Sequence, residues 1–482
     1  MVDARDGKDQ SLRAVLNTEA ALKRSFYVFS LIASLNHALT YVVTAFAASL
    51  LPLKLGGLIC GITWSLNAVS GLTVATISVR RLGWKAAIIV SFWGYSLQII
   101  SLYVAILYPE YSYVVGAGGA VFAGVTSAIW WTAQGVCFEL TSTRIAESRL
   151  TISAAGGEGP HYSSFDEAVN SVRADLSARW TIVYQLSDIL VFLSLSVIPI
   201  LFPSVKIVHV LGWICILGVG TSLLGFGFDD LGDKGAVLNS EEMLDALLAV
   251  PRQFRNDSRV MLLAPFVFGF GITTAMFSYY INGNVVSRSA NLGEIYIGLL
   301  ESFSYLVAAA SAIPYAWVSN RFPPVGQHYV FQFGSLAFLL SGVVVYLLPE
   351  NELSVWQVIL LIRAFYGLGR GVFEGACRAV YASLFAGLDL STAFSGQTLL
   401  AGMSGGICFF AYGYMTREMI AAITVVNGCL ALACYALLLS VPKMFEPLPW
   451  DTLWRHLLFV AGCQRSEEDV KGYREVRDAD ET

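Results

Sequence analysis

The sequence predicts an all-α, multi-pass membrane protein with twelve transmembrane helices in two pseudo-symmetric halves of six. Of its 482 residues, 56% are hydrophobic and only 13% are charged, whereas a soluble domain carries about 25% charged residues. Apolar runs of about 20 residues, the length that a helix needs to cross a bilayer, recur along the whole chain. A polar segment at 229–258 divides these runs into six and six.

Each predicted span is a long and mainly apolar run. In order, the runs are 25–50, 56–78, 84–107, 113–138, 180–202, 206–228, 259–282, 292–317, 327–348, 354–377, 393–415 and 418–441. The seventh and the tenth are the least uniform in hydrophobicity.

The distribution of Lys and Arg predicts that both termini are cytoplasmic. With the N-terminus inside, the cytoplasmic segments hold 23 Lys and Arg residues and the outer loops hold 4. Cytoplasmic loops of membrane proteins carry this excess of positive charge. The short loop with Arg80, Arg81 and Lys85 indicates the same orientation by itself.

The polar segments complete the predicted domain organisation. It consists of a cytoplasmic tail (1–24), a first half (25–228), a cytoplasmic linker (229–258), a second half (259–441) and an interfacial helix with a charged tail (442–482). Residues 139–179 are rich in Gly, Ser and acids and predict a disordered cytoplasmic loop. Asn239 and Ser240 are typical of a helix start in the linker, and the Trp and Leu spacing of 449–460 predicts a helix in the membrane interface.

Composition argues against several other classes of protein. The eight cysteines are scattered without a CxxC pair, which indicates buried thiols rather than a metal site or a disulfide framework. The sequence contains no GxSxG, P-loop, HExxH or dinucleotide-binding turn, so we expect neither an enzyme nor a cofactor. The net charge of −5 includes no basic stripe of the kind that binds nucleic acids.

Weak internal similarity supports two related halves, as in many transporters. The loops SVRRLGWKAA (78–87) and VSNRFPPVGQ (318–327) lie at equivalent places, and each has an Arg just past a helix end. The fourth span contains GVTSAIWWTAQGVCF (124–138) and the tenth contains GLGRGVFEGACRAVY (367–381). Both segments begin with Gly and have a small residue at the fifth position.

These features resemble the major facilitator superfamily, with its twelve spans, central linker and cytoplasmic ends. The family's loop motif, roughly G-x-x-x-D-R-x-G-R-K, is similar to residues 76–85. Arg81, Gly83 and Lys85 match the motif, whereas Arg80 replaces the Asp. This replacement removes the acid on which the family's charge-relay gate depends.

Two further segments extend the resemblance. Arg363-x-x-x-Gly367-x-Gly369 resembles the family's R-x-x-x-G-x-G helix motif, which normally lies in the fourth span. AIWWTAQG (128–135) and YQLS (184–187) resemble signatures of the uncoordinated-93-like branch. Some members of that branch regulate potassium channels, and others escort receptors between membranes.

The tenth span carries four charged residues on one face. At about 100° per residue, Arg363, Arg370, Glu374 and Arg378 fall within a sector roughly 80° wide. Such a stripe must face protein or water rather than lipid. We expect Arg378 to reach the cytoplasmic boundary, Arg370 and Glu374 to form either an inner-gate pair or a ligand site, and Arg363 to face a cavity.

In the superfamily, the first, fourth, seventh and tenth spans line a central cavity, and the resemblance implies the same here. The substrate-binding candidates are His37, Trp131, Gln134, Tyr280, Asn282, Arg363, Arg370 and Glu374. A pocket with aromatic groups and one basic wall suits a small organic or anionic solute. The alternative for each aromatic residue is interhelical packing, and the alternative for His37 is a hydrogen-bonded packing role.

Asp188 and Glu301 place acids about nine residues inside the fifth and eighth spans. Together with Glu374 they are candidates for proton coupling. A neutral carboxyl bonded to a backbone carbonyl is an equally good interpretation.

Two functions follow from the sequence. The first is alternating-access transport of a small solute or ion, which the stripe of charges favours. The second is a non-transporting regulator or trafficking escort of a channel or receptor, which the altered loop motif favours. The expected partners are the lipid bilayer and either that solute or that protein, and the sequence does not indicate an oligomeric state.

Overall fold

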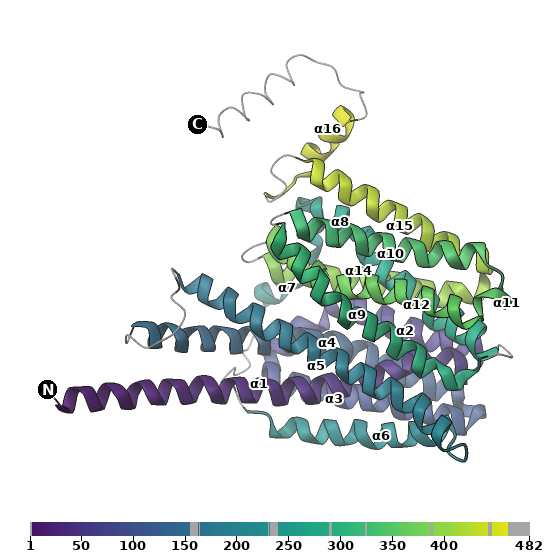
Figure 1. Cartoon of the computed structure of the whole chain (residues 1–482), viewed down its shortest axis with the longest axis horizontal. Coiled ribbons are helices and arrows are strands. Elements are labelled where there is room, and N and C mark those ends of the chain that lie inside the picture. Colours follow the sequence, from purple (N-terminus) through teal and green to yellow (C-terminus); the bar gives the residue numbers. More distant parts are fainter. Residues whose placement is uncertain are drawn as a thin grey trace.

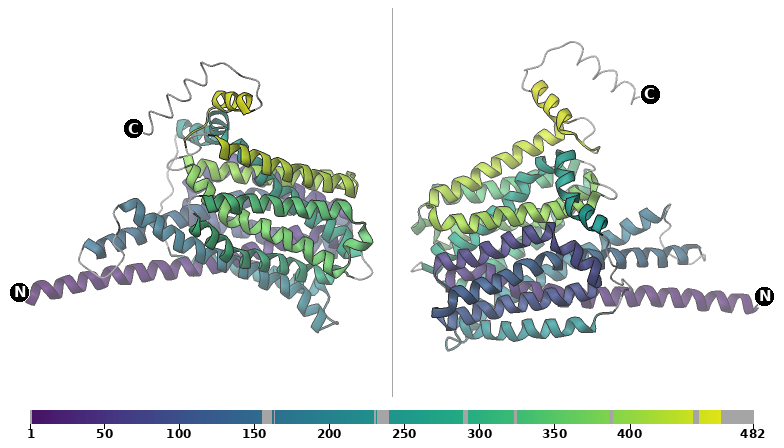
Figure 2. Two further views of the ribbon diagram at one scale, coloured as in Figure 1. Left: turned by 45° about the horizontal axis from the view of Figure 1, so that its top comes forward. Right: turned by 180° about the vertical axis from the view of Figure 1, so that it is seen from behind.

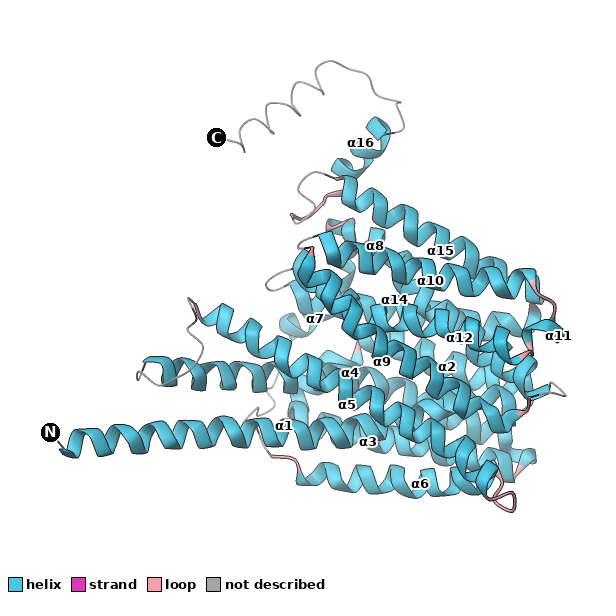
Figure 3. Ribbon diagram, viewed as in Figure 1, coloured by secondary structure: helices cyan, strands magenta, loops and turns pink. Residues whose placement is uncertain are grey.

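The computed structural model describes most of the chain as helix. The described residues are 2–154, 162, 164–229, 231, 240–288, 292–322, 325–385, 389–441 and 446–460. Within these ranges the structure contains helices and loops and no strand (Figure 3). Ten of the described helices are long and apolar enough to cross a membrane.

The first six predicted spans form one group of helices, the first half of the bundle. Its helices are α1 (Val2–Leu50), α2 (Leu53–Leu72), α3 (Val74–Leu107), α4 (Ser112–Ala154), α5 (Phe165–Leu201) and α6 (Ile207–Leu224). Figure 1 shows them, in purple to teal, in the lower part of the molecule. The turn between the second and third spans lies at Gly83, whose φ of 74° interrupts α3. Glycine adopts this left-handed backbone at no steric cost, which explains the Gly of the loop motif.

The last six predicted spans form the second half, in green to yellow in Figure 1. Its long helices are α8 (Arg259–Ala275), α9 (Ile297–Arg321), α10 (Val325–Leu347), α12 (Trp356–Gly371), α14 (Asp389–Ala411) and α15 (Arg417–Ser440). The seventh span continues from α8 as a π-helix, Met276–Val286, and the tenth continues from α12 as a second π-helix, Val372–Ala376, followed by α13 (Cys377–Leu384). These are the two spans with the least uniform hydrophobicity, and π-helical turns often mark functional sites.

Two helices outside the spans lie at one end of the bundle, which we call the linker end. They are α7 (Ser240–Asn256) and α16 (Trp450–Val460), so a helix occurs in the linker and another in 449–460, where the sequence predicted them. The segment before α16 is tied to the start of α8. The backbone N–H and the hydroxyl of Ser258 both donate to the carbonyl oxygen of Leu448 at 2.8 Å, and Leu448 N–H donates to Asp257 Oδ1 at 3.3 Å.

The disordered loop expected at 139–179 is wrong. The helix α4 continues to Ala154 and α5 begins at Phe165, so only residues 155–161 and 163 lie outside the described chain. The two extensions bury apolar residues against each other, including Ile145, Ala146, Val172 and Leu176. The Gly and Ser residues between the two helices led to the prediction of disorder, although apolar residues recur on both sides of them.

The polar tail at 1–24 is also helical, because α1 begins at Val2. Together with α4 and α5 it projects from the linker end (Figures 1 and 2). Arg149 of α4 donates to Glu19 of α1 at 3.2 Å and to the hydroxyl of Tyr162, just before α5, at 3.1 Å. The Tyr162 hydroxyl in turn lies 3.4 Å from Ser171 Oγ of α5.

The two halves meet along two seams, α2 against α14 and α5 against α9. In the first seam, a Cβ atom added at Gly405 would lie 2.5 Å from the Trp64 ring. In the second seam, Leu299 N–H donates to Ser196 Oγ at 2.8 Å, and Ser302 Oγ donates to the Ile189 carbonyl at 3.1 Å. These two contacts hold the halves together. The charged residues of the tenth span lie between them.

Candidate functional site

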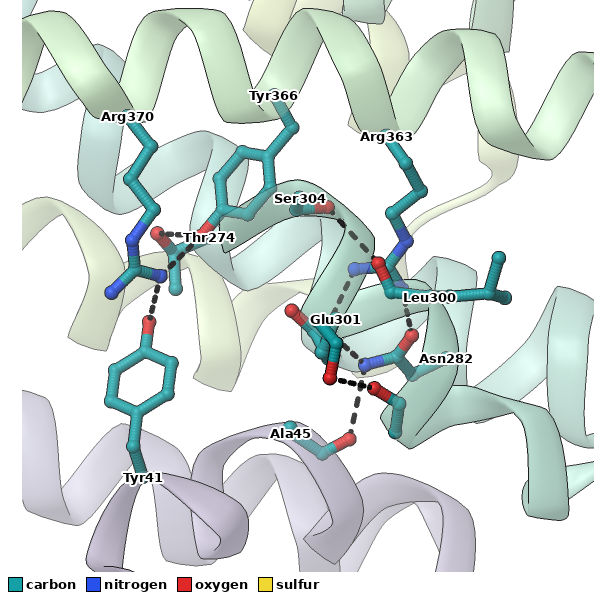
Figure 4. A network of polar contacts seen from close by, with 12 residues as sticks. Tyr41, Ala45, Thr274, Asn282, Leu300, Glu301, Ser304, Arg363, Tyr366 and Arg370 are labelled. Carbon is teal, nitrogen blue, oxygen red and sulfur yellow. Dashed lines mark hydrogen bonds and ion pairs between the residues drawn. The ribbon is translucent and has the colours of Figure 1, made fainter. Parts of the chain in front are cut away.

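The charged face of the tenth span points into the protein, as predicted. Arg363 and Arg370 are 0% and 1% exposed, and Figure 4 shows both side chains directed from α12 toward α1. Arg370 and Glu374 form an ion pair of 2.7 Å with the predicted spacing of four residues. The guanidinium of Arg378 lies 5.7 Å from the centre of the Trp131 ring in the first half.

Arg363 binds two groups of the second half. Its Nη1 lies 2.7 Å from Glu301 Oε1, and its Nη2 donates to Asn282 Oδ1. The guanidinium also lies 4.9 Å from the centre of the Phe277 ring. Because Glu301 is only 3% exposed, each buried charge compensates the other. Arg363 therefore contacts protein rather than an open cavity in this conformation.

Asn282 extends this network to the first half. Its Nδ2 donates to Glu301 Oε1 at 2.8 Å and to the backbone carbonyl oxygen of Ala45 at 3.1 Å (Figure 4). Ala45 lies near the end of α1 that is remote from the linker end. The structure thus brings Asn282, Glu301 and Arg363 into one buried network that also joins the two halves.

Arg370 lies in a second cluster, inside a box of aromatic rings. Its Nη1 donates to the hydroxyls of Tyr41 and Tyr366, each at 3.4 Å. The guanidinium carbon lies 4.2 Å from the centre of the Tyr305 ring and 5.8 Å from that of Phe270. Desolvated cation–π contacts of this kind are each worth about 2 kcal/mol, so the aromatic rings help to hold a buried charge.

Glu374 and the fifth span join the halves at the linker side of Arg370. Gln185 Nε2 donates to Glu374 Oε2, and Arg370 Nε donates to Glu374 Oε1 at 2.7 Å. Asp188, one turn beyond Gln185, is completely buried. Neither of its carboxyl oxygens has a hydrogen-bond partner among the residues that the structure describes.

His37 is the centre of an aromatic cluster in the first half. Its Nδ1 lies 3.2 Å from the hydroxyl of Tyr184, and the rings of Trp130, Trp131 and Tyr184 lie between 5.2 and 5.4 Å away. Gln134, one turn beyond Trp130 on α4, is also buried. Tyr41 packs on His37 at 5.9 Å and joins this cluster to Arg370.

Two sets of predicted residues lie apart from this centre. The hydroxyl of Tyr280 donates at 2.9 Å to Glu350, in the short helix α11 (Glu350–Leu353) at the end of the bundle opposite the linker end. In the loop motif, Arg80 and Arg81 are exposed. Lys85 donates to the carbonyl of Phe228 and so holds the start of the linker against the first half.

Two surface hollows lie away from the charged centre. One, of about 370 Å³, is lined by residues that include Leu22, Arg144 and Asp229, and the other, of about 470 Å³, by residues that include Tyr103 and Trp213. None of the predicted substrate-binding residues lines either hollow. In this conformation, Arg363, Arg370 and Glu374 bind other protein side chains.

Sequence reasoning missed four residues of the centre. They are Tyr41, Gln185, Tyr305 and Tyr366. Each lies three or four residues from a candidate, which is one helical turn. A search for polar or aromatic residues one turn from every candidate residue would have found them.

Comparison with known proteins shows the fold. No protein-family model matches the sequence, and no curated protein matches it significantly. Among solved structures, the nucleoside transporter NupG has a TM-score of 0.58 at 12% identity, covering 87% of this chain and 100% of that chain. The peptide transporter POT in complex with sulfate has a TM-score of 0.60 at 14% identity, covering 88% and 96%.

The xylose transporter XylE from E. coli, in a partially occluded inward-open conformation, has a TM-score of 0.55 at 14% identity and covers 87% of this chain and 98% of that chain. These similarities show that the chain has the major facilitator fold of two six-helix halves. It is therefore an integral, multi-pass membrane protein whose structural neighbours are transporters.

Proposed function

We propose that this chain transports a small solute across a membrane by alternating access between its two halves. The observation that carries the proposal is the position of Arg370. This buried cation donates to Tyr41 of the first half and pairs with Glu374 of the second half, which in turn binds Gln185 of the first. A charge held at the contact between two mobile halves is well placed to sense a solute between them.

The chemistry around Arg370 favours an organic solute with an anionic or hydrogen-bond-accepting group. Guanidinium groups bind carboxylates and phosphates through paired donors, so such a group can replace Glu374 when the halves separate. The rings of Tyr41, Tyr305 and Phe270 offer flat apolar surfaces for the remainder of the solute. The structural neighbours transport nucleosides, peptides and xylose, so these classes of solute should be tested first.

The hydrogen bond from Asn282 to Ala45 and the bonds between α5 and α9 hold the halves together on the side remote from the linker end. With both termini in the cytoplasm, as we propose from the Lys and Arg distribution, this side is the outer one. Transport then requires a second conformation in which these bonds are broken.

The test is uptake by the purified protein in liposomes, with radiolabelled nucleosides, di- and tripeptides, sugars and organic anions. We expect uptake of at least one class, and a loss of about tenfold or more in Arg370→Met, equivalent to one charge-assisted hydrogen bond. Arg252→Met is the control, because Arg252 forms an exposed pair with Asp245 on α7. No uptake by the wild type, or unchanged uptake by Arg370→Met, contradicts the proposal.

A second candidate is a regulator or trafficking escort of another membrane protein, as the resemblance to the uncoordinated-93-like branch implies. The projecting ends of α1, α4 and α5, which Arg149 and Tyr162 connect, favour it because they offer a structured surface outside the bundle (Figure 2). Co-purification of one defined channel or receptor, lost in Arg149→Ala, together with no solute uptake, supports this candidate over transport.

A further inference from the structure

The central region has three carboxyl groups, the buried Asp188 and Glu301 and the partly buried Glu374, and two of them form ion pairs with arginine. Glu301 has Arg363 at 2.7 Å, and Glu374 has Arg370 at 2.7 Å. Asp188 interacts electrostatically with Arg370, Glu374 and Glu301, but its oxygens accept no hydrogen bond from the described part of the chain. Arg370 is therefore the nearby arginine for both Glu374 and Asp188. It forms an ion pair with Glu374, and Asp188 has no ion pair among the described residues.

The helix register places Asp188 beside Arg370. Because α5 and the tenth span run in opposite directions through the fold, three residues forward from Gln185 matches four residues back from Glu374. Gln185 binds Glu374 directly. Asp188 and Arg370 each lie about one helical turn from this contact, in the same direction along the bundle, and are therefore at nearly the same depth. Arg370 therefore interacts with two acids, one on each half: it pairs with Glu374 and interacts electrostatically with Asp188.

The other groups near Asp188 do not supply a compensating charge. His37 shares its Nδ1 contact with Tyr184, and its ring is enclosed by aromatic rings rather than by a carboxylate. Tyr41 and Tyr305 face Arg370 from α1 and α9. Arg378 lies further toward the linker end, over Trp131. An ionised carboxylate with no partner in such surroundings is strongly disfavoured, and a bound proton removes its charge.

We propose that Asp188 binds one proton in this conformation and releases it when Arg370 moves from Glu374 to Asp188. The proton goes to solvent as the halves separate at the Gln185–Glu374 contact. The second step rests on the proposed transport function and makes Asp188 the group that couples solute movement to a proton gradient. The first step is independent of any solute.

A proton fits the site better than a metal cation. Ions such as sodium or calcium need several oxygen ligands around them, about six for calcium. Within the described part of the chain, no group of three or more His, Cys, Asp or Glu residues could hold a metal ion. Asp188 offers a single carboxyl group.

Infrared spectroscopy of the full-length protein in lipid nanodiscs tests the proton site directly. The wild type should show the carbonyl stretching band of a protonated carboxylic acid, and Asp188→Asn should lose it. Asp188→Glu keeps a carboxyl group at this position and should keep the band at a shifted frequency. Loss of the band in Asp188→Asn alone then reflects the missing carboxyl group and not misfolding. Glu350→Gln, which changes an exposed acid on α11, is the matched control and should leave the band intact.

The exchange of partners gives a second infrared signature. In Glu374→Gln, Arg370 has only Asp188 to pair with, so the band should disappear although Asp188 is present. In the double variant Arg370→Met, Glu374→Gln, the band should return. The proton site is overturned if the wild type has no such band, if the band survives Asp188→Asn, or if the band forms only when choline replaces sodium in the buffer.

Liposomes test the coupling step with the solute found by the uptake panel. For one proton per solute, a gradient of one pH unit drives up to about tenfold accumulation. We expect this accumulation in the wild type, and only equilibration in Asp188→Asn. Accumulation by Asp188→Asn overturns the coupling step. No uptake of any solute overturns the transport proposal and the coupling step, whereas the infrared result still decides the proton site.

Discussion

Asn282 of the seventh span donates a hydrogen bond to the backbone carbonyl of Ala45 in the first span, at 3.1 Å. The same side chain binds both members of the buried pair Arg363–Glu301. One amide group therefore couples a charge network inside the second half to the contact between the halves. It does so from a π-helical segment, where the backbone departs from regular α-helix.

Replacement of Asn282 should favour separation of the halves at the end remote from the linker. Asn282→Ala removes one hydrogen bond between halves, worth about 0.5–1.5 kcal/mol, so the population ratio should shift by roughly two- to tenfold. Spin labels at Tyr111, just before α4, and Tyr414, just after α14, report this opening in a cysteine-depleted background, because both residues are exposed. Asn284→Ala is the control, because Asn284 bonds to Glu350 within the second half. An equal shift in Asn284→Ala would contradict the assignment.

Removing one member of the buried pair Arg363–Glu301 should strongly destabilise the protein. Arg363→Met leaves a buried carboxylate without its cation, which costs about 3–5 kcal/mol, whereas the double variant Arg363→Met, Glu301→Gln should recover much of the loss. Thermal unfolding in detergent measures both. For comparison, Arg173→Met breaks a partly exposed pair with Glu139 and should cost at most about 1 kcal/mol. Additive effects of the two core changes would show that the pair does not act as a unit.

The seam between α2 and α14 should not tolerate larger side chains. Gly405→Ala places a methyl group 2.5 Å from the Trp64 ring, and overpacking of this kind costs about 1–3 kcal/mol. Gly220→Ala in α6 has no atom within 4 Å of the new methyl group. It should be neutral or stabilising, by up to about 1 kcal/mol. Unfolding temperatures of the two variants check the difference, and equal temperatures would count against close packing at this seam.

Asp257 should control the docking of the C-terminal helix α16. It accepts hydrogen bonds from Leu448 N–H and from Arg259, which is buried. In Asp257→Ala, the segment before α16 loses this contact, so hydrogen exchange over 450–460 should become faster. Asp245→Ala removes an exposed acid of α7 that pairs with Arg252, and exchange should not change. Unaltered exchange in Asp257→Ala would mean that other contacts hold α16.

The sequence predicted those features that depend on neighbouring residues of one helix. Helices occupy all twelve predicted spans, and ten of the described helices are long and apolar enough to cross a membrane. Hydrophobic length is a local property, which is why the sequence predicts it. The ion pair Arg370–Glu374 followed from a spacing of four residues. The error at 139–179 has the same origin, since composition alone does not show which apolar residues of two separate segments will pack together.

The amino-acid sequence by itself determined the membrane class, the division into halves and the face on which Arg363 and Arg370 lie. Only the tertiary structure decided which groups form ion pairs and hydrogen bonds with these two arginines. Arg363 pairs with Glu301, 62 residues away, and Gln185 binds Glu374, 189 residues away. Asp188 and Glu301 looked alike in sequence, yet one is paired and the other is not. The physical reason is that the energy of a buried charge depends on the few ångströms to its partner, and helix packing sets that distance.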